Sequence, residues 1–143
     1  MITVIDTNIF IGACIGQGAC LDVIASCLKK NNHALMGSAL FAEYEDVLAR
    51  NSLFKNSRLS APEREELLDI FIASTMWTKV YYNWRPNLKD EADNHLIELA
   101  IAGNAECIVT RNLRDFANME LKFPELQILS PENFLKQKKR QGE

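Results

Sequence analysis

The chain has 143 residues, of which 48% are hydrophobic and 24% are charged, so it fits one domain with a sizeable core. Its formal net charge of −3 argues against a protein that binds nucleic acid over a broad basic face, because non-specific affinity comes mostly from phosphate neutralisation. No apolar run approaches the ~18 residues of a membrane helix, and Asp6 lies too early for a signal-peptide core, so we expect a soluble, cytoplasmic protein.

Short extended apolar runs alternate with longer runs of helical periodicity, which is typical of an α/β fold with a mainly parallel central sheet flanked by helices. The first run, Ile2–Ile5, predicts a strand that delivers Asp6 to its carboxyl end. Apolar residues at helical spacing then predict a helix over 21–28 that ends near Lys29. Ala34–Met36 predicts a second strand.

The cysteines are Cys14, Cys20, Cys27 and Cys107. They form no CxxC pair, which argues against a thiolate metal site. Cys20 and Cys27 fall in the predicted helix at a seven-residue interval, so we expect them to act as small buried apolar groups.

Two helices are predicted in the middle of the chain. Ser38 is the expected N-cap of the first, which carries apolar residues over 41–48. Ser60 and Glu63 form a capping-box pattern ahead of the second, whose apolar positions end at Ile72.

The second half of the chain continues the alternation. Lys79–Tyr82 predicts a strand, and Asp90 is expected to cap a helix that runs through Ala100 and stops at Gly103 or Asn104. Cys107–Thr110 and Leu126–Leu129 predict two more strands.

The last predicted helix has Ser130 as its cap and Pro131 at its first position. Lys136–Arg140 then carries four positive charges in five residues. We interpret it as a solvated helix end or frayed tail, with a contact to RNA or a partner as the alternative. The predicted division is a domain over 1–135 and a basic tail over 136–143.

Acidic and amide side chains fall at points that this layout brings together. Asp6 follows the first strand, and Asn112 and Asp115 follow the strand that ends at Thr110. Because ligands bind outside the carboxyl ends of the strands in a doubly wound sheet, these residues are expected to share that edge. The sequence therefore predicts an acidic cleft there.

Two helical acids are expected to join them. Asp93 precedes Ile97 by four residues and Glu43 precedes Val47 by four, so both lie on apolar stripes. A buried unpaired carboxylate is costly, so each is expected to meet a cation, hydrogen-bond donors or a metal. Hard oxygen ligands favour Mg²⁺ or Mn²⁺ over zinc, and such a site suits metal-dependent phosphodiester hydrolysis.

The order of these residues along the chain resembles that of a known family. It is similar to the PIN-domain ribonucleases, in particular the small bacterial and archaeal group that act as toxins of toxin–antitoxin pairs. The resemblance covers nearly all of the chain and depends on the order and spacing of short motifs. The matching segments are 4–9 (VIDTNI), 38–50, 89–100 (KDEADNHLIELA), 108–116 (IVTRNLRDF) and 129–134 (LSPENF).

Carried over residue by residue, the resemblance implies catalytic roles for Asp6, Glu43 and Asp93, with Asp6 and Asp93 as metal ligands. Its fourth acidic position falls on Asn112, which has a carbonyl oxygen but no charge, and Asp115 three residues later is the candidate to supply that charge.

Further polar residues flank these positions. Thr7, Asn8, Thr110 and Arg111 are the candidates for positioning the substrate. For Thr7 and Asn8 the alternative is a helix-capping turn, and for Arg111 it is an ordinary solvated charge. His95, two residues after Asp93, is turned roughly 200° around the helix, so we expect it to be exposed. Four aromatic residues cluster around one predicted strand and loop, namely Trp77, Tyr81, Tyr82 and Trp84. Packing in the core or in an oligomer is the favoured interpretation for them, with base stacking as the alternative.

The leading hypothesis is a Mg²⁺- or Mn²⁺-dependent endoribonuclease, with RNA as substrate, a small antitoxin as partner and a homodimer as the family's common state. A haloacid-dehalogenase-type phosphatase is disfavoured, because the second Asp that it needs is Asn8 here. A receiver-like module is disfavoured too, because this chain lacks the acidic pair at the first strand and the lysine at a later strand end that a receiver needs. A degenerate module that binds a protein or RNA partner stays open, because Asn112 departs from the commonest pattern.

Overall fold

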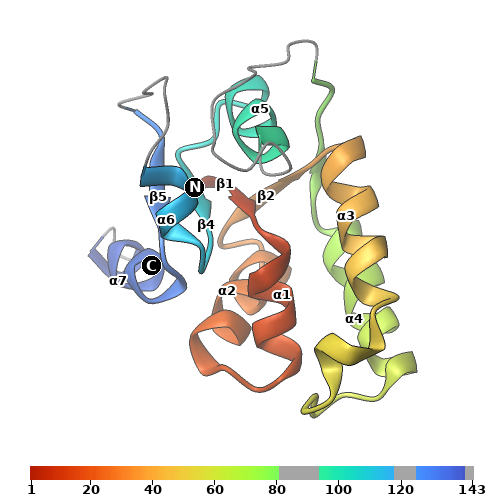
Figure 1. Ribbon diagram of the computed structural model, residues 1–143. Helices are drawn as coiled ribbons and strands as arrows, with labels where there is room; N and C mark the ends of the chain where they lie inside the picture. Colours follow the sequence, from red (N-terminus) through yellow and green to blue (C-terminus); the bar gives the residue numbers. More distant parts are fainter. Residues whose placement is uncertain (81–93, 118–124, 141–143) are drawn as a thin grey trace.

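The computed structural model describes residues 1–80, 94–117 and 125–140, and these residues form an α/β fold around a parallel sheet (Figure 1). The strand order is β3-β2-β1-β4-β5, and each pairing is parallel. The predicted fold class is therefore confirmed. The strands are β1 (Ile2–Ile5), β2 (His33–Met36), β3 (Met76–Trp77), β4 (Cys107–Val109) and β5 (Gln127–Leu129).

Helices connect the strands. In Figure 1, α5 lies on the opposite side of the sheet from α1 and α2. Among the described residues no single helix is long and apolar enough to cross a membrane; α1 and α2 reach that length and composition only as a pair bent by 111°. The helices are α1 (Thr7–Cys14), α2 (Gly18–Leu28), α3 (Ser38–Leu48), α4 (Ala61–Ala73), α5 (Asn94–Ala102), α6 (Leu113–Ala117) and α7 (Pro131–Arg140), with a 3₁₀ turn at Asn51–Phe54.

Local signals set the start of α4 and the ends of α2 and α5 where the sequence predicts them. At α4 the Ser60 hydroxyl accepts a hydrogen bond from the Glu63 N–H at 3.3 Å, and the Glu63 carboxylate accepts one from the Ser60 N–H at 2.8 Å. Lys30 and Asn104, just past α2 and α5, adopt φ of 62° and 55°, the left-handed conformation that ends a helix. The start of α3 differs from the prediction, because Gly37 is the N-cap and Ser38 is the first helical residue.

The predicted strand over 79–82 is wrong in position. Its described residues, 79 and 80, are not in a strand, whereas β3 lies at Met76–Trp77 and pairs with Leu35 and Met36 of β2. The Thr78 N–H donates to the Met36 carbonyl, and the chain of β2 then turns into α3. No further length of β2 remains for residues after Thr78 to pair with, so the strand ends there.

Two short helices were not predicted. Helix α1 follows β1 directly, although Gly12 and β-branched isoleucines lower its intrinsic helix propensity, because its apolar residues are buried in the core. The single turn of α6 follows β4. Both begin at the carboxyl end of a strand, where the candidate site lies.

Helix α7 includes the basic residues up to Arg140, so the predicted boundary after residue 135 falls inside this helix. Lys138 is 5% exposed, its ammonium donates to the Asn31 carbonyl, and it lies 5.6 Å from the Phe134 ring centre. This lysine therefore ties α7 to the end of α2.

The core lies between the sheet and its helices. All four cysteines are buried free thiols, as predicted for Cys20 and Cys27. Burial raises the pKa of Cys14 to about 11 and that of Cys107 to about 12, so both thiols stay protonated at neutral pH.

Candidate active site

Asp6 lies where β1 ends and α1 begins. It occupies the N-cap position, but its side chain makes no capping hydrogen bond. Instead its Oδ2 accepts from the Thr110 hydroxyl at 2.8 Å and from the Asn8 amide at 3.1 Å, while the Thr7 hydroxyl lies 3.5 Å from Oδ1. The carboxylate therefore bridges two strand ends, and a backbone hydrogen bond from Thr7 adds to these contacts.

The loop after β4 is tied to the same network. The Thr110 hydroxyl also accepts from the Asn112 N–H at 2.9 Å, and the Asn8 amide oxygen accepts from the Arg111 N–H at 3.1 Å. The Asn112 amide in turn donates to Asp115 at 2.5 Å. The two strand ends thus converge as the sequence predicts, and Asp115 lies directly beside Asn112.

The electrostatics of this edge are set by Asp6, which is only 5% exposed. Burial raises the pKa of the Asp6 carboxyl; the hydrogen bond from Thr110 opposes this, the charge of Glu43 adds to it, and His95 lowers it. Glu43 and His95 therefore lie close enough to act on Asp6. A cation placed beside Asp6 would relieve both unfavourable effects.

Glu43 projects from α3 toward His95 of α5. The His95 Nε2 lies 3.0 Å from the Glu43 Oε2, although the two do not align as a hydrogen bond. Oε2 of Glu43 and Nδ1 of His95 are buried atoms with no hydrogen-bond partner in the described part of the chain. Each side chain of the pair thus has a polar atom at the edge of the site that can contact a ligand.

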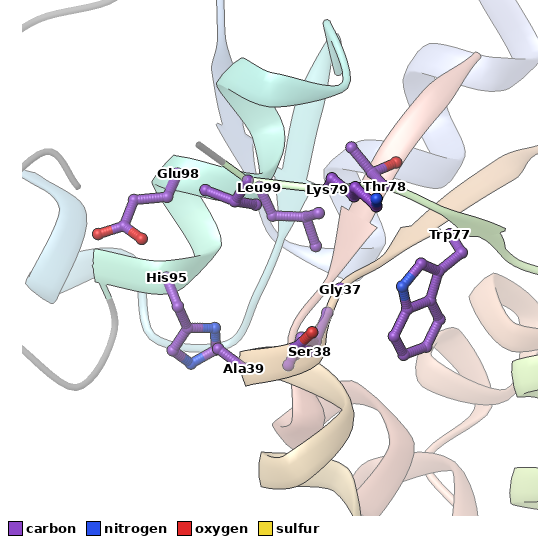
Figure 2. A pocket seen from close by; sticks show the side chains of 11 residues that line it. Gly37, Ser38, Ala39, Trp77, Thr78, Lys79, His95, Glu98 and Leu99 are labelled. Carbon is purple, nitrogen blue, oxygen red and sulfur yellow. The ribbon is translucent and has the colours of Figure 1, made fainter. Parts of the chain in front are cut away.

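The expectation that His95 is exposed was wrong, because its side chain is only 13% exposed. Figure 2 shows it reaching from α5 toward the first turn of α3. The helical-wheel argument assumed that α5 buries one face. In fact α5 packs across β1, β2 and β4 and also contacts α3, so its residues are buried almost all round. The sequence signal for this burial is that α5 carries apolar or small residues on nearly every side.

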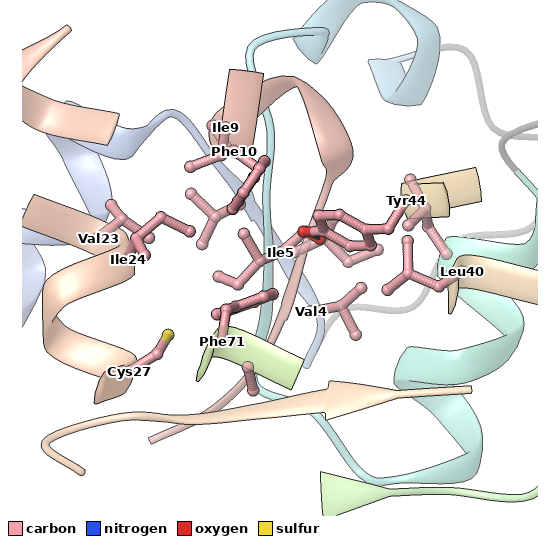
Figure 3. Close-up of a cluster of buried hydrophobic side chains, with 14 of the residues drawn as sticks. Val4, Ile5, Ile9, Phe10, Val23, Ile24, Cys27, Leu40, Tyr44 and Phe71 are labelled. Atoms are coloured by element: carbon pink, nitrogen blue, oxygen red, sulfur yellow. Dashed lines mark hydrogen bonds between the residues drawn. The ribbon is translucent and has the colours of Figure 1, made fainter. Parts of the chain in front are cut away.

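Tyr44, next to Glu43, is a positioning residue that the sequence pattern assigned only to packing. Its hydroxyl donates to the Ile5 carbonyl at 2.8 Å, directly before Asp6. Its ring, shown in Figure 3, packs against Phe10 and Phe71 at centroid distances of 5.9 and 5.7 Å. The hydroxyl therefore fixes α3, and with it Glu43, relative to the end of β1.

Arg111 is held by other protein groups. Its Nη1 lies 2.6 Å from Glu132 at the start of α7, and its Nη2 lies 3.4 Å from Gln17 Oε1 and 3.6 Å from the Cys20 sulfur. Its backbone N–H contacts Asn8, as described above. Arg111 thus ties the loop after β4 to α7 and α2, and its guanidinium is ion-paired with Glu132 although it is partly exposed.

Asp93 lies outside the described residues, so its place beside Asp6 stays a prediction. Within the ranges 1–80, 94–117 and 125–140, no three His, Cys, Asp or Glu side chains are placed to hold one metal ion. The oxygens of Asp6 and Glu43 nevertheless have the hard-donor chemistry that Mg²⁺ or Mn²⁺ prefers, and each has an oxygen with free capacity.

Comparison with known proteins points to one family. A family model described as PIN domain matches residues 3–114. Among solved structures, the chain is similar to the crystal structure of VapBC2 from Rickettsia felis bound to a DNA fragment from their promoter, with a TM-score of 0.59 and 20% sequence identity over 91% of this chain and 98% of that chain. At this identity the likeness concerns the fold. No curated protein matches the chain.

Proposed function

Because the chain belongs to the PIN-domain family, whose members are generally nucleases, we propose that it is a divalent-metal-dependent endoribonuclease and the toxin of a type II toxin–antitoxin pair. The observation that carries the proposal is the buried carboxylate of Asp6, bonded to Thr110 across two strand ends, with Glu43 near enough to raise its pKa. Such a carboxylate needs compensation, and a divalent cation bound there would supply it.

The donors fit Mg²⁺ or Mn²⁺. Asp6 and Asp93 would hold the ion directly, and Glu43 and Asp115 would complete its surroundings or bind its water. When bound, a divalent cation lowers the pKa of water and stabilises charge that develops on a phosphodiester. His95 lies beside Glu43, with its Nε2 3.0 Å from the Glu43 carboxylate.

The chain's own side chains have distinct tasks in this proposal. Thr110 and Asn8 orient the Asp6 carboxylate through their hydrogen bonds. Asn112 contacts the phosphate or the attacking water through its amide, and Asp115 orients that amide. The nucleophile is water, so no covalent link to the protein forms.

The proposed setting is the bacterial or archaeal cytoplasm, with RNA as substrate. We propose a cognate antitoxin that covers the site and a homodimer of the chain. Family membership and the fold shared with VapBC2 support the partner protein. The second candidate function is a catalytically degenerate module that binds a protein or RNA partner. The observation that favours it is the neutral Asn112.

The test is cleavage of a mixed RNA pool by the purified chain with Mg²⁺ or Mn²⁺. EDTA, Asp6→Asn and Asp93→Asn should each abolish cleavage, whereas Asp69→Asn, an exposed acid on α4, should leave it intact. A folded protein that cleaves no RNA with either metal would favour the degenerate module. Cleavage that survives both EDTA and Asp6→Asn would contradict the proposed site.

A further inference from the structure

A cavity of about 380 Å³ opens between α3, α5 and the end of β3. This α3–α5 pocket adjoins the candidate active site, because His95 lines it and also faces Glu43. Its volume falls in the range of small-ligand sites, roughly 300–1,000 Å³. Its side chains include Ser38, Trp77, Lys79, His95, Glu98 and Leu99.

One wall of the pocket is aromatic. Trp77 is 56% exposed although it is a large apolar side chain, and Phe41 supports its ring from one side at a centroid distance of 5.8 Å and an angle of 64°. In Figure 2, Trp77 and His95 lie on opposite sides of the first turn of α3. An exposed indole held by a neighbour is a stacking platform for a nucleobase of any identity.

The other walls offer polar groups that suit the rest of a nucleotide. The hydroxyl of Ser38, at the start of α3, can donate a hydrogen bond to a base or accept one from it. The Nδ1 of His95 is a buried atom without a partner in the described part of the chain. Lys79, exposed at the pocket, supplies the positive charge that attracts a backbone phosphate.

We infer that the α3–α5 pocket binds one nucleotide of single-stranded RNA beside the bond to be cleaved, with its base against Trp77 and its phosphate near Lys79. The inference rests on the proposed ribonuclease function and adds the place where one unpaired nucleotide of the substrate binds. A base inside a duplex has no exposed face for Trp77, whereas bases of single strands and loops can be splayed out and stacked on aromatic side chains.

The test is binding of a fluorescein-labelled ten-nucleotide RNA, measured by fluorescence anisotropy in EDTA so that no cleavage occurs. Trp77→Ala should weaken binding of the single strand about tenfold, and Trp77→Phe should restore most of it, because stacking on one aromatic ring typically contributes that much. Lys79→Gln should also weaken binding.

Ile70→Ala and Lys55→Gln change exposed residues outside the pocket; they are the matched controls and should bind like the wild type. Binding of the same sequence as a duplex should change less than about twofold in Trp77→Ala.

If folded Trp77→Ala and Lys79→Gln bind the single strand as tightly as the wild type, the inference that the pocket binds a nucleotide is overturned. Metal-dependent cleavage that is lost in Asp6→Asn would still support the nuclease. A wild type that neither binds nor cleaves RNA would overturn both. Conversion of a dimer into a monomer by Trp77→Ala, with RNA affinity unchanged in sedimentation and anisotropy measurements, would instead assign the pocket to a contact between two copies of the chain.

Discussion

The imidazole of His95 lies 3.0 Å from the carboxylate of Glu43, and this contact joins α5 to α3 at the edge of the candidate site. Both groups act on the buried Asp6, since the charge of Glu43 raises the pKa of that carboxyl and His95 lowers it. His95 therefore compensates part of the acidic charge that Asp6 and Glu43 bring together.

Replacing His95 should impair cleavage without unfolding the protein. We expect His95→Ala to reduce the rate of RNA cleavage about 10–100-fold, the usual cost of removing a group that surrounds the ligands of a metal site. His95→Gln keeps a polar side chain of similar length beside Glu43 and should recover part of the rate. Initial rates at saturating Mn²⁺, with melting curves of both variants, measure this. Equal rates for wild type and His95→Ala would show that the contact with Glu43 has no functional role.

Ionisation of Asp6 should lower stability. Its pKa is raised in the folded protein above the ordinary 3.8, mainly by burial. The folded state therefore binds a proton at Asp6 more readily than the unfolded chain, so the free energy of unfolding falls as pH rises from 3.8 through the raised pKa and stays lower above it.

In EDTA at pH 7.5 we therefore expect Asp6→Asn to melt at a higher temperature than the wild type, and the two to converge below about pH 4. Asp69→Asn, the exposed control, should show no such difference. A wild type that is the more stable protein at pH 7.5 without metal would mean that hydrogen bonds to Asp6 outweigh its burial.

The hydroxyl of Tyr44 should contribute to both stability and activity. Tyr44→Phe leaves the buried Ile5 carbonyl without its 2.8 Å donor, so we expect a loss of about 1–3 kcal/mol and a melting point lower by roughly 3–8 °C. Because Ile5 precedes Asp6, cleavage should fall as well, even where the variant is fully folded. Phe71→Leu, which perturbs the same aromatic cluster but no hydrogen bond at β1, should lower stability with a smaller effect on the folded protein's rate.

Salt dependence of RNA binding should separate the two cations near the site. Lys79 lines the α3–α5 pocket, so Lys79→Gln should reduce the slope of log affinity against log salt by about 0.7–1. Arg111 is already paired with Glu132 at 2.6 Å, so Arg111→Gln should leave that slope unchanged. A slope that falls in Arg111→Gln would show that RNA displaces Glu132 from the guanidinium.

The sequence predicts the parallel sheet and the convergence of Asp6 with the loop after Thr110, because residues that follow parallel strands lie at one edge of the sheet whatever the details of packing. It predicts the ends of α2, α4 and α5 equally well, since capping residues act locally.

The misplaced features depend on contacts between elements. The position of β3 depends on where β2 ends, which residues 79–82 do not reveal. His95 is mostly covered because α5 contacts both the sheet and α3, and a single-face helical pattern does not show a second packing partner. The pairing of Arg111 with Glu132 joins residues 21 positions apart through the placement of α7.

The most direct test of the metal-dependent site is binding of Mn²⁺ measured by isothermal titration calorimetry on the wild type, Asp6→Asn and Asp69→Asn. We predict that the wild type and Asp69→Asn bind the ion equally well and that Asp6→Asn binds at least about tenfold more weakly, because it loses a charged oxygen ligand. Undiminished Mn²⁺ binding in Asp6→Asn would contradict a metal centre at the end of β1.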